Sequence, residues 1–394
     1  MEPGIERRAV VSGIGQSDVG RRLNRGDLDL TIEAALAAIH DAGLTRDDVD
    51  GIASYPGGGG ALPPGFSGPG TPEVQDALRL RVGWHMGGLE GPAQLAPVIN
   101  ACLAVAAGLA NHVLVYRTVS EATAQGSGRR GGMGLGAPDR RVGGMFQWML
   151  PYHAYSAATW VALYAQRHMH EYGTTREQLG AMAINSRRNA GGNPKAIFRE
   201  PLTMEEYLNA RMITTPFGLF DCDVPCDGST AVIVSRAERA GGPNLPIKVN
   251  AVGTAIRGRP SWDQWEDLTT MAMRDAAAQM WSRTELTPRD VHVAELYDGF
   301  SWLTLAWLEA LGFAPKGEGG PFVEGGKRIA LEGELPLNTS GGQLSAGRLH
   351  GFGLLHEACV QLRGLGGDRQ AGSPEVAAVA AGGGPIAGCL LLTR

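Results

Sequence analysis

Two stretches of the chain, Leu44–Ala53 (LTRDDVDGIA) and Leu286–Glu295 (LTPRDVHVAE), repeat one pattern in its two halves. Each stretch follows an alanine-rich helical pattern and leads into a short apolar run, which is typical of a buried strand. A second pair, Ala101-Cys102 and Ala358-Cys359, lies farther on, in both cases within a helical pattern that follows a glycine-rich turn. Two pairs in the same order indicate an old duplication, and an internal repeat decides the architecture of a chain.

The duplication predicts two α/β halves, joined near residues 241–246. We expect an N-terminal half over residues 1–240 and a C-terminal half over residues 246–394. Residues of about 121–215 include many Trp, Tyr and Met but show no sheet rhythm. They are therefore expected to form a loop or cap region inserted into the first half.

Short apolar runs alternate with longer helical patterns, as in α/β proteins. Strands are predicted at Ala9–Gly13, Val49–Ser54, His112–Val119, Ser229–Ser235 and Ile247–Ala255. Helices are predicted at Leu30–Ala42, Pro97–Ala107, Ala154–His170 and Arg176–Ala190. Thr31 is expected to cap the first helix. His168 is expected at the surface, because it lies at a polar helix end.

The composition excludes several classes of protein. The chain has 394 residues, of which 43% are hydrophobic and 19% charged, so it can bury a large core. A net charge of −5 gives no reason to expect nucleic-acid binding. No apolar run approaches the ~18 residues that suggest a membrane span. Five scattered cysteines indicate a reducing cytoplasm, without a disulfide framework or a metal site.

Four further motifs follow one another over essentially the whole chain: Cys226–Ala231 (CDGSTA), Glu295–Ser301 (ELYDGFS), Asn338–Gly342 (NTSGG) and Gly382–Gly384 (GGG). They resemble the DGA-type turn, the ENEAF or EHDCF segment, the NxxGG turn and the final GGG of the thiolase superfamily. The resemblance implies duplicated α/β halves in a layered αβαβα sandwich with an inserted cap. It also implies a homodimer.

The positions that carry thiols in thiolases hold no cysteine here. Gly91 stands where the family's nucleophile begins a helix, and Ala380 stands two residues before the GGG. Arg348 occupies the place of the GHP histidine. Covalent acyl transfer needs a nucleophile, so ordinary thiolase chemistry is not expected.

Other side chains can still act on a thioester. Tyr297 stands where thiolases place the Asn or His that polarises the thioester oxygen, and a phenol can serve as general acid or base. Gly347–Gly351 (GRLHG) resembles the GYxHG pattern of the sterol-carrier and lipid-transfer branch, which includes steroid side-chain-cleaving acyl-CoA aldolases. His350 matches that pattern, whereas Arg348 replaces its Tyr. We expect Arg348 to lower the pKa of Tyr297 from about 10 toward neutrality.

The thiolase framework brings two helix N-termini to one site, where partial positive charge and free N–H groups stabilise an anion. Here those helix starts lie near Gly91 and Gly347–Phe352. The resemblance adds the backbone N–H groups of Gly383 and Gly384, which would hold an enolate oxygen. Asn338 is expected to secure its turn and to contribute to substrate binding.

The leading hypothesis is a lyase: an aldolase that cleaves a β-hydroxyacyl-CoA, possibly one with a steroid or other bulky side chain. Tyr297, with Arg348 or His350, would remove the β-hydroxyl proton. The division of acid and base roles, the acyl group and the direction of reaction stay open. No metal or nicotinamide is implied, and coenzyme A enters only as part of the substrate.

Two alternatives stay open, a non-catalytic acyl-CoA-binding or lipid-transfer subunit and an acyltransferase with an unconventional nucleophile. The aldolases of this branch also imply a small zinc-ribbon/OB-fold partner protein.

Overall fold

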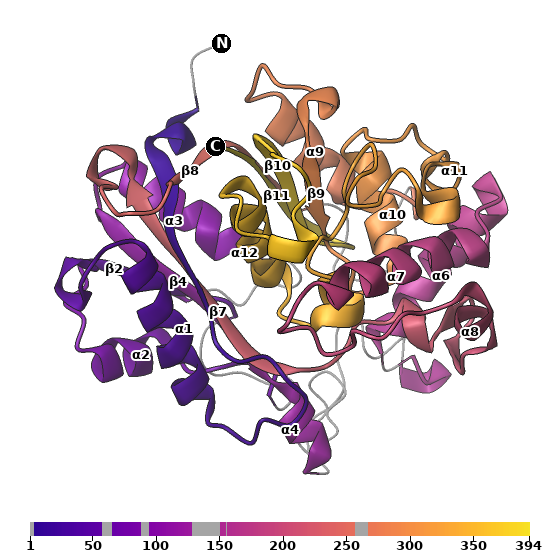
Figure 1. Ribbon diagram of the computed structural model, residues 1–394, viewed down its shortest axis with the longest axis horizontal. Helices are drawn as coiled ribbons and strands as arrows, with labels where there is room; N and C mark the ends of the chain where they lie inside the picture. Colours follow the sequence, from indigo (N-terminus) through magenta and orange to yellow (C-terminus); the bar gives the residue numbers. More distant parts are fainter. Residues whose placement is uncertain (1–3, 57–64, 88–93, 128–149, 155, 257–266) are drawn as a thin grey trace.

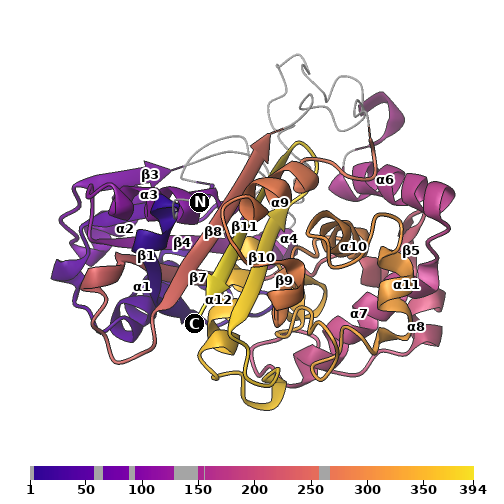
Figure 2. The ribbon, with the colours of Figure 1, turned by 90° about the horizontal axis from the view of Figure 1, so that it is seen from above.

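The computed structural model describes residues 4–56, 65–87, 94–127, 150–154, 156–256 and 267–394. A nine-stranded mixed sheet runs through its centre, with helices on both faces (Figure 1). Seen from above, the C-terminal strands lie between the N-terminal half and a largely helical cap (Figure 2). A layered α/β arrangement around a large sheet is the fold class that the sequence predicts.

The strand order of the sheet is β3-β2-β4-β7-β1-β8-β11-β10-β9. Its strands are β1 Ala9–Gln16, β2 Gly51–Ser54, β3 Trp84–Gly87, β4 His112–Ser120, β7 Asp227–Arg236, β8 Ile247–Ile256, β9 Val293–Leu296, β10 Val376–Gly382 and β11 Ile386–Thr393. A separate hairpin in the cap pairs β5 (Met212–Thr214) with β6 (Phe217–Gly218).

The order reads outward from the centre as the same motif twice. The parallel pair β2 and β4 corresponds to the parallel pair β9 and β10. The antiparallel neighbours β7 and β1 correspond in the same way to β11 and β8. The halves join where Val10 of β1 pairs with Lys248 of β8. This mirrored order is what a duplication produces, while the boundaries at residues 240 and 246 stay a prediction.

The helices are α1 Asp27–Asp41, α2 Thr71–Leu78, α3 Ala96–Ala106, α4 Glu121–Gly126, α6 Ala157–Tyr172, α7 Arg176–Gly191, α8 Met204–Asn209, α9 Met273–Trp281, α10 Ser301–Ala310, α11 Gly319–Val323 and α12 Gly351–Leu362. All four predicted helices form, with ends shifted by a few residues. The N-cap prediction is wrong: α1 begins after Gly26, and the hydroxyl of Thr31 donates to the carbonyl of Asp27 inside the helix.

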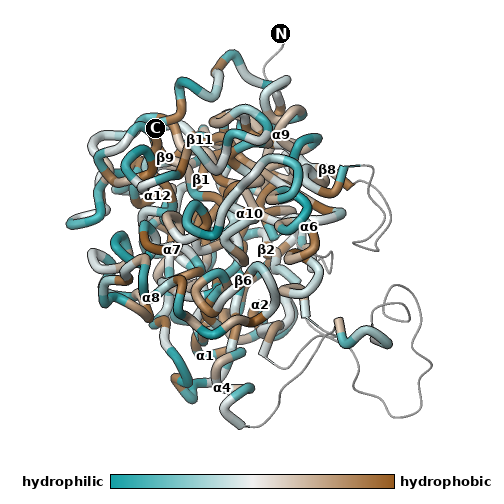
Figure 3. The backbone as a smooth tube through the Cα atoms, turned by 90° about the vertical axis from the view of Figure 1, so that its right-hand side faces the viewer, coloured by the Kyte–Doolittle hydropathy of each residue, from teal (hydrophilic) through white to brown (hydrophobic). Residues whose placement is uncertain are grey.

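Alternation along β4 divides the N-terminal core into two layers. Leu114 and Tyr116 pack with α1 and α2, whereas Val113 and Val115 pack with α3. Successive strand residues point to opposite faces, so Arg117 also belongs to the α3 face. Brown, hydrophobic segments lie mostly inside the molecule, and many of the teal, hydrophilic segments lie at its periphery (Figure 3).

The two repeated stretches fold in the same way. Thr45 donates its backbone N–H and hydroxyl to Asp48, both over 2.7 Å, at the short helical turn before β2. Thr287 makes the same two bonds to Asp290, over 2.7 and 2.8 Å, before β9. This capping box fixes the direction in which each strand leaves the turn.

In the cap, the surface prediction for His168 is wrong. Its side chain is fully buried, with Nδ1 2.8 Å from the hydroxyl of Thr174 and Nε2 3.1 Å from the carboxylate of Glu309. These two hydrogen-bond partners offset the free-energy cost of burying the polar imidazole. Within the described part of the chain, no helix is both long and apolar enough to cross a membrane.

Candidate active site

The side chains of Tyr297 and His350 meet where β9 ends and α12 begins. Tyr297 follows the last residue of β9, and His350 directly precedes α12. The phenol oxygen lies 3.4 Å from Nδ1 of His350, and both side chains are buried. The sequence therefore predicted two residues that the fold brings into contact. Their catalytic roles stay predictions.

His350 is held in an unusual state. Its φ of 54° lies in the left-handed region, which costs a non-glycine residue of order 1–3 kcal/mol and is frequent at functional sites. Burial and then the positive charges of Arg117 and Arg348 keep its pKa well below 6.5. The imidazole is therefore neutral at pH 7. Its Nε2 has no hydrogen-bond partner among the described residues.

Arg348 does not bring the pKa of Tyr297 to neutrality, and its role in catalysis stays a prediction. Its Nε lies 2.8 Å from Oε2 of Glu121, and its Nη1 lies 2.9 Å from Oδ1 of Asp223. Arg348 favours ionisation of Tyr297, but burial and the negative charge of Asp223 prevail and raise the pKa of Tyr297 above 10. The expectation of a phenol that ionises near neutrality is therefore wrong. Tyr297 is a protonated hydrogen-bond donor.

Asp223 is the ionisable group that the sequence analysis missed. Its backbone N–H donates to the carbonyl of Gly299 over 3.2 Å, which places it against the segment that carries Tyr297. Burial raises the pKa of Asp223 to about 7, although Arg348 opposes the rise. A carboxyl group that titrates near neutrality is suited to act as a general base. Asp223 lies between Cys222 and Cys226, shortly before the CDGSTA motif, and its carboxylate is the signal in the sequence.

Asp298 and Asn338 attach the NTSGG turn to the end of β9. The carboxylate of Asp298 accepts the backbone N–H groups of Gln343 and Leu344, over 2.9 and 3.3 Å. In Asn338, Oδ1 accepts the N–H of Leu296 over 2.7 Å and Nδ2 donates to its carbonyl over 2.9 Å. Asn338 therefore secures its turn. Its role in substrate binding stays a prediction.

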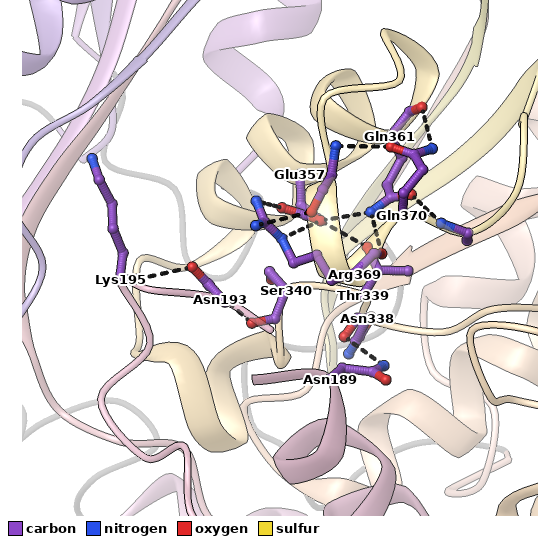
Figure 4. Close-up of polar contacts among 12 residues, drawn as sticks. Asn189, Asn193, Lys195, Asn338, Thr339, Ser340, Glu357, Gln361, Arg369 and Gln370 are labelled. Atoms are coloured by element: carbon purple, nitrogen blue, oxygen red, sulfur yellow. Dashed lines mark hydrogen bonds and ion pairs between the residues drawn. The ribbon is translucent and has the colours of Figure 1, made fainter. Parts of the chain in front are cut away.

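A network of hydrogen bonds and an ion pair also holds the NTSGG turn in place (Figure 4). On one side, Asn193 of the cap donates to the carbonyl of Ser340 over 2.9 Å. On the other side, the hydroxyl of Thr339 bonds to Glu357 over 2.9 Å, and Arg369 pairs with Glu357 at 2.9 Å. A cavity of about 180 Å³ opens beside this network and reaches His350. The turn is thus braced by both the cap and α12.

The starts of α3 and α12 come together at the end of β10. A Cβ atom on Gly351 would approach Cβ of Ala381 to 2.6 Å and atoms of Gln94 and Leu95 to 3.5 Å. Glycine therefore permits this close approach. The buried Gly383 and Gly384 follow two and three residues after Ala381. Their N–H groups stay a prediction as enolate donors, and Gly91 lies outside the described residues.

None of the chain's five cysteines is activated. Burial raises the pKa of the thiols of Cys102, Cys222 and Cys359 to about 12. It also raises the pKa of Cys226, which lies beside Gly347, and of Cys389. A nucleophilic cysteine requires the opposite shift. In the described part of the chain, no group of three His, Cys, Asp or Glu side chains is arranged to hold a metal ion.

Comparisons with known proteins agree with this geometry. A family described as "Thiolase C-terminal domain-like" matches residues 255–390. The chain is 34% identical to a steroid side-chain-cleaving aldolase of Thermomonospora curvata, over 97% of both chains. It is 33% identical to a 17-hydroxy-3-oxo-4-pregnene-20-carboxyl-CoA lyase of Mycobacterium tuberculosis, over 98% of this chain and 100% of that one.

Among solved structures, one described as "Ltp2-ChsH2(DUF35) aldolase" superposes with a TM-score of 0.88 at 32% identity, over 99% of both chains. The chain belongs to the thiolase superfamily. Within that superfamily it is an enzyme of the sterol-carrier type, a lyase related to the acyl-CoA aldolases.

Proposed function

We propose that this lyase cleaves the Cα–Cβ bond of a β-hydroxyacyl-CoA by a retro-aldol reaction, which releases a ketone or aldehyde and a shortened acyl-CoA. The contact between Tyr297 and His350 carries the proposal, because it places a phenol donor and the imidazole that orients it at a helix start that lacks a nucleophilic thiol. The neighbouring Asp223, with a pKa of about 7, supplies the base that such a cleavage needs.

In this scheme Asp223 and Tyr297 together transfer one proton from the β-hydroxyl group to Cα. Asp223 accepts the proton of the β-hydroxyl group, and the carbonyl of the ketone or aldehyde forms as the Cα–Cβ bond breaks. The electron pair of that bond passes to the thioester, which becomes an enolate. Tyr297 then donates its proton to Cα and recovers a proton from Asp223. Arg348 keeps Asp223 partly ionised near pH 7. The proposed scheme uses no metal ion and no nicotinamide.

Backbone N–H groups at the start of α12 and near Gly383 and Gly384 would stabilise the enolate oxygen. An oxyanion donor of this kind is typically worth about 2.7–4 kcal/mol in the transition state. The neutral imidazole of His350 would orient the phenol of Tyr297 through Nδ1. This division of roles follows from the pKa directions of the two residues.

The names of the relatives support a bulky substrate. One relative is named for cleavage of a steroid side chain, and the other for a steroid with a hydroxyl at position 17 and an acyl-CoA at position 20. A hydroxyl at that position is β to the thioester, as the retro-aldol reaction requires. We therefore propose a β-hydroxyacyl-CoA that carries a steroid or similarly large alkyl portion.

The test is incubation of the purified protein with synthetic β-hydroxyacyl-CoAs, followed by detection of the released ketone and acyl-CoA by mass spectrometry. Tight binding of the substrate without any release, with the partner protein present, would favour a lipid-transfer subunit instead. A mass increase of one acyl group on a cysteine would favour an acyltransferase.

We also propose a homodimer that works with a small zinc-ribbon/OB-fold partner in the cytoplasm. The description of the solved relative names two components, which supports a partner. All five cysteines are free thiols, which fits a reducing compartment. Co-expression with a candidate partner tests this, because a complex should co-purify and cleave the substrate faster than the isolated chain.

A further inference from the structure

Arg117 of β4 is a buried cation, and two of its nitrogens have no hydrogen-bond acceptor among the described residues. Its side chain is 0% exposed. Nη1 donates to the backbone carbonyls of Phe66, Thr118 and Tyr55, over 2.6, 3.1 and 3.3 Å. The guanidinium lies over the rings of Phe66 and Tyr55, 4.8 and 5.2 Å from their centroids. Nε and Nη2 have no acceptor among the described residues, and a buried unpaired donor is costly.

Those two nitrogens form one edge of the planar guanidinium. Their N–H bonds run side by side, which is the arrangement that binds two oxygens of a planar anion or grips one oxygen twice. A lysine at this position would keep the charge but not the edge. The open edge of Arg117 is therefore suited to an oxygen anion rather than to a neutral alkyl group.

Arg117 lies at the proposed active site. The ring of Phe66, which stacks with its guanidinium, meets the ring of His350 at 5.0 Å in an edge-on contact. The charge of Arg117 is the largest charge effect on the pKa of His350, and Tyr297 and Glu121 are among the groups that act on Arg117. Arg117 is therefore close enough to His350 and Tyr297 for its charge to act on both.

Among the described residues, the charge of Arg117 is also not balanced by a close ion pair. Glu121, whose charge acts on Arg117, and Asp223 are both paired with Arg348. Burial lowers the pKa of Arg117 to about 10, so it is still protonated at neutral pH. A buried cation without its own counterion stabilises an anion that forms next to it, because little water is present to screen the two charges.

We propose that the Nε–Nη2 edge of Arg117 binds the anionic oxygen that develops on the thioester during retro-aldol cleavage. The inference rests on the proposed function and adds a side-chain donor to the backbone N–H groups named above. Arg117 forms no covalent bond. Its hydrogen bonds strengthen as the electron pair of the Cα–Cβ bond reaches the thioester oxygen, so they act mainly on the transition state.

The test uses S-(2-nitroethyl)-CoA, whose deprotonated nitronate is a planar anion with two oxygens on the acyl side of the sulfur, its nitrogen two bonds beyond the carbon that corresponds to the thioester carbonyl. Titration calorimetry at a pH where the nitronate persists should show binding about 100-fold weaker in Arg117→Gln than in the unmodified protein. Arg117→Lys should lose about 10-fold. Neutral S-ethyl-CoA should bind all three proteins within about threefold.

Arg176→Lys is the matched control. The guanidinium of Arg176 also lies over a tyrosine ring, that of Tyr207 at 5.5 Å, but it faces Asp221. This variant should bind the nitronate as the unmodified protein does. Because Arg117→Gln leaves three carbonyls without a donor, its fold is checked by circular dichroism. If it does not fold, Arg117→Lys decides: unchanged nitronate affinity in that variant overturns the proposal.

The binding assay needs no turnover, so it separates this inference from the proposed function. A protein that needs Arg117 to bind the nitronate but never cleaves a β-hydroxyacyl-CoA contradicts the proposed function alone. A protein that cleaves the substrate and binds the nitronate equally well without the arginine edge contradicts the role of Arg117 alone. Where cleavage occurs, kcat should fall in Arg117→Lys by about 10-fold with little change in KM.

Discussion

Tyr55 and Tyr297 occupy matching positions in the two halves of the molecule. Each follows the last residue of a four-residue strand, β2 or β9, and each strand is reached through a turn closed by a Thr–Asp capping box. Their surroundings differ. Tyr55 lies under the guanidinium of Arg117, whereas Tyr297 contacts the imidazole of His350 and feels the negative charge of Asp223.

The difference shows that the duplicated backbone determines the position of each tyrosine, whereas the neighbouring side chains determine its chemical properties. Burial raises the pKa of both phenols, to about 12 for Tyr55, where the adjacent cation opposes the rise. Around Tyr297, Asp223 adds to the rise. The proposed proton transfer therefore involves the C-terminal tyrosine. The N-terminal tyrosine supports the cation that faces the site.

The largest expected effect separates the two tyrosines directly. Tyr297→Phe should lower kcat for cleavage of a β-hydroxyacyl-CoA by about 10²- to 10⁴-fold, because it removes the proton donor. Tyr55→Phe keeps the ring under Arg117 and should lower kcat by less than about 10-fold. Steady-state kinetics of both variants measure this. Equal losses would mean that both halves of the site transfer protons.

The second effect concerns the carboxylate near Tyr297. Asp223→Asn should lower kcat by about 10²-fold, because the amide cannot accept the hydroxyl proton. In the unmodified protein, kcat/KM should rise with pH up to about 7, since the base works only when ionised and its pKa is raised to about 7. The variant should lose that rise. Its persistence in Asp223→Asn would assign the titration to another group.

A smaller effect is expected from Arg348, whose charge acts on Tyr297 and Asp223. Removal of its positive charge in Arg348→Gln should raise the pKa of Asp223, so the rising limb of the pH profile should move up by about one unit or more. Arg348→Lys, which keeps the charge, is the control and should shift it much less. A profile that does not move in Arg348→Gln would contradict the electrostatic link.

The smallest effect is expected from the Thr–Asp capping box, which occurs in both halves. Thr45→Ala and Thr287→Ala remove the hydroxyl bonds to Asp48 and Asp290, while the backbone N–H bonds to the same carboxylates stay. Each should lower the melting temperature by about 1–2 °C and by similar amounts, with little change in kcat. Calorimetric melting measures both. A marked loss of activity only in Thr287→Ala would show that this turn positions Tyr297 as well as supporting the sheet.

Much of the fold could be predicted because short local sequence patterns indicate it. The LTxxDV stretches predicted the duplication, the four motifs predicted the fold, and ELYDGFS with GRLHG predicted Tyr297 and His350 as residues of one site. The predictions for Thr31 and His168 are wrong because the fold buries both residues. Thr31 lies inside α1, where its hydroxyl bonds to Asp27 and Thr118, and His168 is buried against Glu309.

The remaining members of the site could not be predicted from their own surroundings in the sequence. Glu121 and Asp223 reach Arg348 from segments more than a hundred residues away. Arg117 is one of several polar residues in a largely apolar strand. Its meaning depends on Phe66 and His350, which only the folded chain places beside it. The pKa of Tyr297 failed as a prediction because it requires knowledge of every neighbouring charge.

The burial of all five thiols has a practical consequence for the cell and for the bench. Alkylating agents and peroxide attack thiolates, and here the pKa of every cysteine lies far above physiological pH. Cysteine-dependent thiolases are inactivated by iodoacetamide, whereas this lyase should go on working in the same extract. Oxidative bursts that silence acyl transfer would leave carbon–carbon cleavage running.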